Sequence, residues 1–233
     1  MIKTTPFEMV FIIRDCMKDF PMFTTEYGVA SLILKEVPYR KEAYIVIQSS
    51  QQPEELLTEC ISFCRIVGAE KIYARGHEYL ERFPLHCAIY EMKGVSRVND
   101  ELVQNLWPVT TENIEKWRGM LNERMSGVDN AGTLERGDEK EILSLGGAYF
   151  VHNTGELLGA GWVADGELKL IASFKKGAGE RVIHSLLSTV PDQFLSIQVV
   201  STNQRAIRLY EQMGFVKCAE LRRWYCVKNT ENN

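Results

Sequence analysis

Two short stretches of this sequence carry residues whose types and spacing could do chemistry. The first, Lys175-Lys176-Gly177-Ala178-Gly179, follows a β-prone run and opens a helical pattern. Glycines lack the Cβ atom that would block a ligand, so backbone N–H groups and the positive end of the helix can meet a phosphate oxygen. The lysines add positive charge. The stretch lacks both a full GxGxxG and a P-loop ending, and a glycine pair is as often a tight turn, so alone it favours a turn.

The second stretch, VSTNQRAIRLYEQMGFV, runs from Val200 to Val216. Asn203 is a good helix N-cap and Gly214 a good helix stop, so the pattern predicts one short helix between two strands. Asn203 and Tyr210 lie seven residues apart, on a single edge of that helix. The residues at helical spacing that can face a sheet are Ala206, Leu209 and Met213. The polar edge therefore indicates a role besides packing.

The elements around these stretches alternate between strands and helices. Upstream, GGAYFVHNTGELLGAGWVADGELKLIAS predicts an antiparallel meander of three strands, joined at an Asn-Thr-Gly turn and at Asp165-Gly166. After the glycine turn, the apolar spacing predicts a helix on Val182, Ile183, Leu186 and Leu187, and FLSIQVV predicts a strand. A helix before the meander can be capped by Thr111, and its apolar residues are Ile114, Trp117 and Leu121. This part of the chain is thus predicted to be an α/β unit.

Taken together, the strand, the KKGAG turn, the next strand and the helix N-x-x-A-x-x-L-Y-E-x-x-G-F resemble the GNAT superfamily of acetyl-CoA-dependent N-acyltransferases. The resemblance spans roughly Val109 to Val227, and Asn203 to Phe215 is its specific part. It implies an α/β (α+β) fold with a mixed, mainly antiparallel central sheet flanked by helices. It also implies that the turn binds the pyrophosphate of coenzyme A and that the preceding strand bonds to the pantetheine arm.

The resemblance assigns a role to each part of the motif. It implies that Asn203 contacts the cofactor arm and that Tyr210 protonates the departing thiolate, a task that suits a phenol held by a rigid helix. The alternative for Tyr210 is half-buried packing beside Leu209. The full set of implied cofactor-binding residues is Ile171, Ala172 and Ser173 at the strand edge, Lys175, Lys176, Gly177, Ala178, Gly179 and Glu180 at the phosphates, and Asn203, Ala206 and Tyr210 on the helix.

The chain departs from the family pattern at two positions. Phe174 stands three residues before the first glycine, where the family has arginine or glutamine, so phosphate binding is expected to rely on Lys175 and Lys176. Lys169 stands in the strand region where many relatives place a glutamate. The candidates left for a general base are Glu167, His152, His184 or an ordered water.

The first half of the chain, residues 1–97, resembles the same fold without its ligand chemistry, so we expect two tandem halves, the second covering 98–233. Its patterns predict a helix from Pro53 to Gly68 and strands over 27–37, 42–49, 71–75 and 86–92. QSSQQPEE stands where a glycine turn would be, and GHEYLERFP where the asparagine-tyrosine helix would be. This half should therefore bind no coenzyme A. Scaffolding, walling an acceptor pocket and pairing subunits into a homodimer stay open as its roles.

The composition of the chain limits the classes of partner that it is expected to bind. The 233 residues are 45% hydrophobic, enough for a real core, and a net charge of -4 argues against adhesion to nucleic acid or an anionic membrane. No apolar stretch approaches the roughly 20 residues of a membrane span, and we expect a cytoplasmic protein. The six cysteines form no CxxC pair. Cys60 and Cys64 could offer two metal ligands, but no matching histidine pair exists, so buried reduced thiols and no metal are expected.

These observations predict an N-acetyltransferase that moves acetyl from acetyl-CoA to a primary amine of a small molecule or peptide by direct attack. The alternatives are a longer acyl group, a non-amine acceptor, or a non-catalytic acyl-CoA-binding regulatory protein. A dinucleotide-dependent oxidoreductase is remote, because no Rossmann repeat surrounds the glycines. The acceptor is set by the loop RMSGVDNAGTLERGD and by the first half. The acidic residues Asp129, Glu135 and Asp138 could attract a cationic amine or simply lie in a solvated loop.

Overall fold

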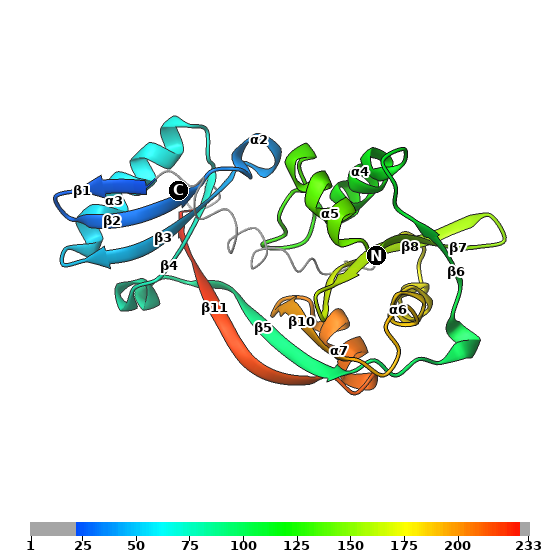
Figure 1. Cartoon of the computed structure of the whole chain (residues 1–233). Coiled ribbons are helices and arrows are strands. Elements are labelled where there is room, and N and C mark those ends of the chain that lie inside the picture. The colour runs from blue at the N-terminus through cyan, green and yellow to red at the C-terminus, as the bar shows by residue number, and fades with distance from the viewer. Residues whose placement is uncertain (1–21, 229–233) are drawn as a thin grey trace. The chain divides into compact units, whose positions relative to one another are not determined.

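The computed structural model describes residues 22–228, and these form two units (Figure 1). The larger unit comprises 89–221, and the smaller unit comprises 22–88 together with 222–228. Strands β5 (Leu85–Val95) and β11 (Val216–Lys228) each contribute residues to both units. The two halves expected from the sequence, 1–97 and 98–233, stay a prediction. The contacts between residues divide the chain between Ala88 and Ile89, and they assign the end of β11, from Arg222 on, to the smaller unit.

The smaller unit is a sheet covered by one long helix. Its strand order is β1-β2-β3-β4-β11, with β3 and β4 parallel and the other pairs antiparallel. Helix α3 begins at Pro53, as predicted, and buries Leu56, Leu57, Cys60 and Cys64 in the core of this unit. Its elements are β1 (Met22–Thr25), β2 (Gly28–Ile33), α2 (Val37–Arg40), β3 (Glu42–Ser50), α3 (Pro53–Ile66), β4 (Lys71–Arg75) and the 3₁₀ turn η1 (Glu78–Arg82).

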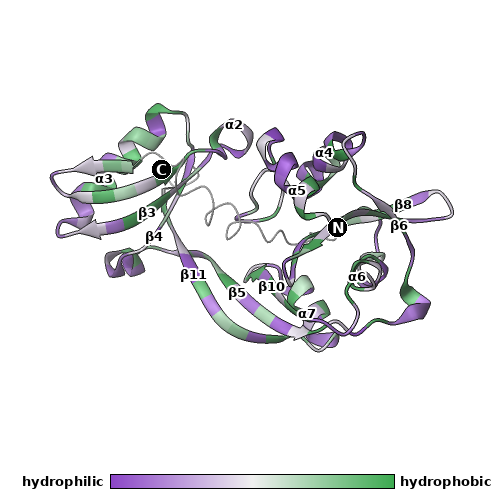
Figure 2. Ribbon diagram, in the orientation of Figure 1, coloured by the Kyte–Doolittle hydropathy of each residue, from purple (hydrophilic) through white to green (hydrophobic). Residues whose placement is uncertain are grey.

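The larger unit has the mixed, mainly antiparallel sheet that the sequence predicts. Its strand order is β11-β5-β10-β9-β8-β7-β6, and β9 with β10 is a parallel pair. Its other elements are η2 (Asp100–Leu102), β6 (Asn105–Pro108), α4 (Ile114–Met125), η3 (Arg136–Asp138), α5 (Glu139–Leu145), β7 (Ala148–Asn153), β8 (Glu156–Ala164), β9 (Glu167–Ser173), α6 (Gly179–Leu187), β10 (Phe194–Val200) and α7 (Gln204–Gln212). Figure 2 shows both hydrophilic and hydrophobic segments along β5 and β11.

The predicted meander is confirmed, and its turns have the expected geometry. Thr154 and Gly155 link β7 to β8, and Asp165 and Gly166 link β8 to β9, each residue with positive φ. Two consecutive positive φ values match the twist of a two-residue hairpin; Gly155, Asp165 and Gly166 adopt them at low cost, whereas the β-branched Thr154 does so at a higher one. The meander therefore follows from local turn chemistry.

Helix α6 lies very close to β8 because two glycines there have no side chain. A Cβ atom at Gly159 would lie 2.6 Å from the Val182 side chain, and one at Gly161 would collide with Leu186 and lie 2.6 Å from the Leu170 carbonyl oxygen. The apolar face of α6 is fully buried as predicted, at Val182, Ile183, Leu186 and Leu187. Gly159 and Gly161 of β8 thus allow α6 to pack closely against the sheet.

Two sequence expectations about local structure are wrong. Helix α4 begins at Ile114 with Asn113 at the N-cap position, not at Thr111, because Asn113 Oδ1 accepts a hydrogen bond from the Thr110 N–H (2.8 Å) and holds the preceding turn. The strand expected over 27–37 ends at Ile33, because the short helix α2 begins at Val37 and has Pro38 in its first turn.

The expectation of buried thiols is confirmed for Cys60, Cys64 and Cys87, whereas Cys218 is exposed. Cys16 lies outside the described residues. Burial raises the pKa of Cys60 to about 12 and that of Cys64 to about 11. Within residues 22–228, no group of three or more His, Cys, Asp or Glu side chains is arranged to hold a metal ion. None of the helices in that range is long and apolar enough to cross a membrane.

Candidate functional site

The parallel strands β9 and β10 pair at their start and then part. The pairing consists of Glu167 opposite Ser196, with the Ser196 N–H donating to the Gly166 carbonyl oxygen (3.0 Å). Farther along, β9 continues its pairing with β8 as far as Ser173, while β10 continues its pairing with β5 as far as Val200. The β10-facing edge of β9 at residues 171–173 therefore has no strand partner within residues 22–228, although the Ser173 carbonyl oxygen accepts from Arg124.

Arg124, near the end of α4, reaches the last residue of this edge. Its Nε donates to the Ser173 carbonyl oxygen (2.7 Å), and the Ser173 hydroxyl donates to the Lys175 carbonyl oxygen (2.7 Å). These bonds fix the end of β9 and the first residues of the turn that follows. Sequence reasoning missed Arg124, because only the fold brings the end of α4 to the end of β9.

The strand β9 contains a β-bulge at Lys169. Trp162 of β8 lies opposite Leu170 and Val163 opposite Leu168, so Lys169 is the extra residue. Lys169 is 5% exposed, and its Nζ lies 3.5 Å from Asp165 and 3.7 Å from Glu167. This position, where the resemblance implies a glutamate, therefore carries an ion-paired lysine and no carboxylate base.

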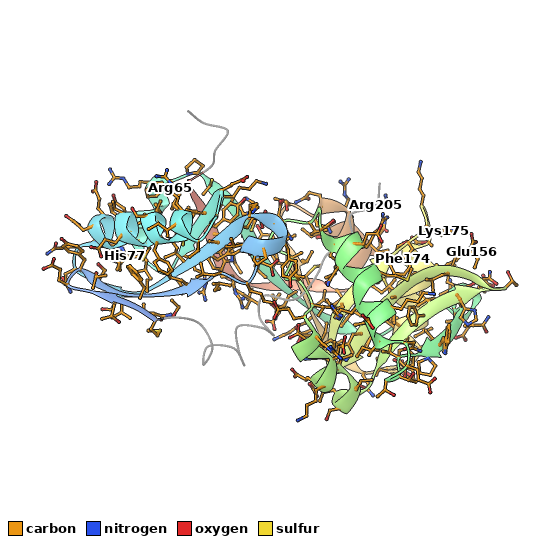
Figure 3. All side chains as sticks on the ribbon, turned by 90° about the horizontal axis from the view of Figure 1, so that it is seen from above. Arg65, His77, Glu156, Phe174, Lys175 and Arg205 are labelled. Carbon is orange, nitrogen blue, oxygen red and sulfur yellow. The ribbon has the colours of Figure 1, made fainter. Side chains whose placement is uncertain are left out.

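The glycine turn leaves the start of α6 open. Gly177 has φ +84, and nothing lies within 4 Å of the place where a Cβ atom would stand. Helix α6 begins at Gly179 without a side-chain cap, and the first N–H groups of a helix have no acceptor within it. Lys176 is exposed, and Lys175, labelled in Figure 3, forms an ion pair with Glu156 at the start of β8 (2.8 Å). Open N–H groups beside the exposed Lys176 suit an anionic ligand, and Lys175 could join them by leaving Glu156.

Helix α7 buries the predicted motif residues Asn203, Ala206 and Tyr210. Asn203 is the N-cap, as predicted, and its Oδ1 accepts from the Ala206 N–H (3.0 Å). The side chain of Tyr210 is 1% exposed and packs with Phe215, with ring centroids 6.4 Å apart. The shared edge of Asn203, Ala206 and Tyr210 thus belongs to the buried side of the helix.

The three named candidates for a general base differ in their surroundings. Glu167 lies where β9 and β10 begin to part, and its Oε1 accepts from Gln198 Nε2 (3.2 Å). His184 on α6 accepts the Asn99 N–H at Nδ1 (3.1 Å), and burial lowers its pKa. His152 lies on β7, separated from β9 by β8. Glu167 is therefore the one of the three that lies at the parting strands.

Sequence reasoning also missed Gln198 and Glu91, which extend this polar group across neighbouring strands. Glu91 of β5 lies directly opposite Gln198 of β10, and side chains of such pairs share one face of the sheet. Glu91 forms an ion pair with Lys93 (3.0 Å). No local signal could have found this group, because β5 was expected to belong to another half of the chain.

A cavity of about 330 Å³ lies at the start of α7. The hydroxyl of Thr202 donates to Asp129 Oδ2 (2.9 Å) and ties the loop after α4 to the start of α7. Asp129 was a sequence candidate for attracting an amine, whereas the arginines of this pocket were missed. The lining residues are Gly127, Val128, Asp129, Thr202, Asn203, Gln204, Arg205 and Arg208.

No protein-family model matches the sequence, and no curated protein matches it. Solved structures do. A GCN5-related N-acetyltransferase from Kribbella flavida is similar with a TM-score of 0.60 at 10% identity, over 90% of this chain and 60% of that one. Another from Anabaena variabilis has a TM-score of 0.60 at 9% identity, over 93% and 64%. A conserved protein of unknown function from Staphylococcus epidermidis has a TM-score of 0.57 at 10% identity, over 93% and 97%.

These similarities show the fold. The chain has the GNAT-like fold that the sequence motif predicts. It spans less than two thirds of the length of the two acetyltransferases, 60% and 64%.

Proposed function

We propose that this chain is an N-acetyltransferase that transfers the acetyl group of acetyl-CoA to a primary amine by direct attack. The observation that carries the proposal is the parting of parallel strands β9 and β10 directly before the open glycine turn of α6. Both features lie within the larger unit. An edge for amide hydrogen bonds followed by a phosphate cradle matches the two polar segments of coenzyme A in their order along the molecule.

The edge and the turn divide the work of binding. Residues 171–173 of β9 would bond to the amides of the pantetheine arm in the manner of an added strand. The N–H groups at the start of α6, with Lys175 and Lys176, would hold the pyrophosphate. Phe174 offers no charge, so the lysines carry the role that an arginine has in the family pattern. Asn203 and Ala206 would contact the arm from α7.

The chemistry then needs a base and an acid. The amine nitrogen attacks the acetyl carbonyl carbon, the C–N bond forms and the C–S bond breaks. Glu167, directly or through a water, would take the proton that the amine loses. Tyr210 would give its proton to the departing thiolate, and its burial would keep that hydroxyl out of bulk water. One proton passes from the amine to Glu167 and one from Tyr210 to the thiolate, so atoms and charge balance in the acyl transfer.

The second candidate function is acyl-CoA binding without turnover. The observation that favours it is Lys169, which is buried in the strand region where a glutamate base is expected. Under this alternative the edge and the turn would still bind the ligand. Only the chemical step would be missing.

The experiment that separates the two functions uses the full chain. Acetyl-CoA binding is measured by calorimetry, and release of the coenzyme A thiol is followed with a panel of amines, with acetyl-CoA lacking amine as the control. We expect one site per chain and release that depends on an amine. Binding without amine-dependent release would favour the acyl-CoA-binding protein, and absence of binding would refute both.

A further inference from the structure

The pocket at the start of α7 has a charge pattern that the transfer of an acetyl group does not require. Its charged residues are Arg205, Arg208 and Asp129. We propose that this pocket binds a carboxylate of the acceptor, so that the acceptor is an amino acid rather than a simple amine. This inference rests on the proposed function.

Two arginines and one carboxylate line the pocket, so its charged side chains have a net positive charge. Asp129 already accepts the hydroxyl of Thr202 (2.9 Å). Arg208 uses its Nε for the Gln204 carbonyl oxygen (3.2 Å), and neither arginine forms an ion pair with any residue in 22–228. Guanidinium groups bind carboxylates through paired hydrogen bonds, and the start of α7 adds the positive end of a helix. An anionic group of the ligand would therefore be held from two sides.

A buried amide next to this pocket also lacks a partner. Asn130 follows Asp129 directly, its side chain is 3% exposed, and neither Oδ1 nor Nδ2 has a hydrogen-bond partner in the described part of the chain. A buried amide without partners costs free energy that a polar ligand can recover. The same loop lines this pocket through Val128 and Asp129. Asn130 is therefore the side chain that we assign to hydrogen bonding with the acceptor.

The position of the pocket favours the acceptor over the phosphates of coenzyme A. Leu209 faces the phosphate turn, because a Cβ atom on Gly179 would lie 3.9 Å from its Cδ2. A helix turns by about 100° per residue, so Arg208 projects about 100° and Gln204 about 140° away from Leu209, whereas Arg205 lies only about 40° from it. The other wall is the loop after α4. Arg208 and Gln204 thus lie on a different side of α7 from the glycine turn, and Arg205 lies nearer to the side of the turn.

The test compares matched acceptors on the full chain. Each of several amino acids is paired with its own amide, which keeps the amine and removes the carboxylate, and rates are referred to the concentration of neutral amine. We expect kcat/KM to be at least about tenfold higher for the amino acid, the scale of one charge-assisted contact. In the double variant Arg205→Gln with Arg208→Gln, the preference should vanish through the KM of the acceptor while the KM of acetyl-CoA changes less than about twofold.

Matched variants keep the test specific. Arg97→Gln removes an exposed arginine of the same unit outside the pocket and should leave the preference intact. Asn130→Asp keeps the shape and the tolerance of positive φ but replaces a donor with a negative charge, so it should raise the KM of the amino acid more than that of its amide. Thermal unfolding of each variant shows whether the fold is retained.

Three outcomes would overturn the inference. Equal kcat/KM for amino acids and their amides would show that the pocket does not select a carboxylate. A double variant that weakens acetyl-CoA but not its 3′-dephospho form would assign the arginines to the 3′-phosphate of the cofactor. If no amine is acetylated, the proposed function fails, and calorimetric titration with amino acids and their amides then tests the carboxylate site by itself. Selective binding of the amino acid would support the site. Equal binding of both, or no binding, would refute it.

Discussion

Tyr210 packs in the core with its ring, and we propose that its hydroxyl acts as an acid. Removal of the hydroxyl oxygen alone therefore distinguishes the packing role from the acid role. Tyr210→Phe keeps the buried ring and its contact with Phe215 but removes the hydroxyl. If the hydroxyl protonates the thiolate, turnover should fall by about 10²–10⁴-fold while acetyl-CoA affinity changes little. The measurement is single-turnover kinetics beside calorimetry. Tyr149→Phe, at a partly buried tyrosine of the same unit, is the control, and an unchanged rate in Tyr210→Phe would leave only the packing role.

Gly177 is the residue of the turn that the backbone itself requires. Its φ of +84 belongs to the left-handed region, where a residue with a Cβ atom costs about 1–2 kcal/mol. Gly177→Val should therefore move the turn and weaken acetyl-CoA binding by roughly tenfold or more, measured by calorimetry. Gly177→Asn is the matched control, since asparagine tolerates positive φ and should bind nearly as well. Equal losses in both variants would mean that bulk, and not backbone conformation, disturbs the site.

At the residue scale, the sequence predicts those parts of the site that obey local rules. The cap at Asn203 depends on its side chain and on an N–H three residues away, and the turn at Gly177 depends on one φ angle. Both can therefore be predicted from the local sequence. Gln198 with Glu91 and the arginine-lined pocket depend on which strands and loops meet, and no local pattern encodes that. Thr111 was predicted as a cap because of its residue type, but a neighbouring Asn113 holds that turn.

Among the elements, α6 is fastened to the segment 99–104 by two side chains. His184 Nδ1 accepts the Asn99 N–H (3.1 Å), and Ser185 Oγ accepts the Gln104 N–H (2.8 Å). The first bond needs a neutral imidazole, because a protonated ring has no acceptor. Burial lowers the pKa of His184, an effect that the nearby Glu180 opposes. The helix that would carry the phosphate cradle is thus held in place by a titratable contact.

This contact should make part of the stability depend on pH. Folding lowers the pKa of His184, so the unfolded chain binds the proton more readily than the folded chain. The contribution is complete above about 6.5, the usual histidine value, and is lost as the pH falls toward the lower folded pKa. His184→Asn keeps an acceptor for Asn99 but does not titrate. Urea unfolding at several pH values should show a smaller loss of stability below 6.5 in the variant, and parallel curves would contradict the assignment.

The sequence predicted most elements of the larger unit because their signals are local: paired positive-φ residues end the strands of the meander, and an apolar face marks α6. It did not predict the bulge at Lys169, which appears only when β9 is aligned against β8. It also could not place β5 between β10 and β11, because strand order is set by contacts far apart in the chain. The resemblance to an acyltransferase therefore supplied more of the site than the periodicity did.

At the scale of the whole molecule, β5 and β11 are the segments that couple the units. Each is one continuous strand whose residues divide between the larger and the smaller unit. A strand that loses its partners over one part of its length exposes N–H and C=O groups that the other part still has paired. Loss of order in one unit should therefore propagate along both strands. The two units are then expected to unfold together, although their contacts divide them.

Calorimetry of the full chain tests this expectation. We predict one cooperative unfolding transition, and we predict that acetyl-CoA moves the whole of it upward, because a ligand that binds only the native state stabilises everything coupled to its site. At a ligand concentration a hundred times the dissociation constant, the gain is about 2.7 kcal/mol. Gly177→Val should also unfold in one step but gain less from the ligand. Two transitions, with only one moved by acetyl-CoA, would instead mean that β5 and β11 break at the boundary and that the smaller unit folds on its own account.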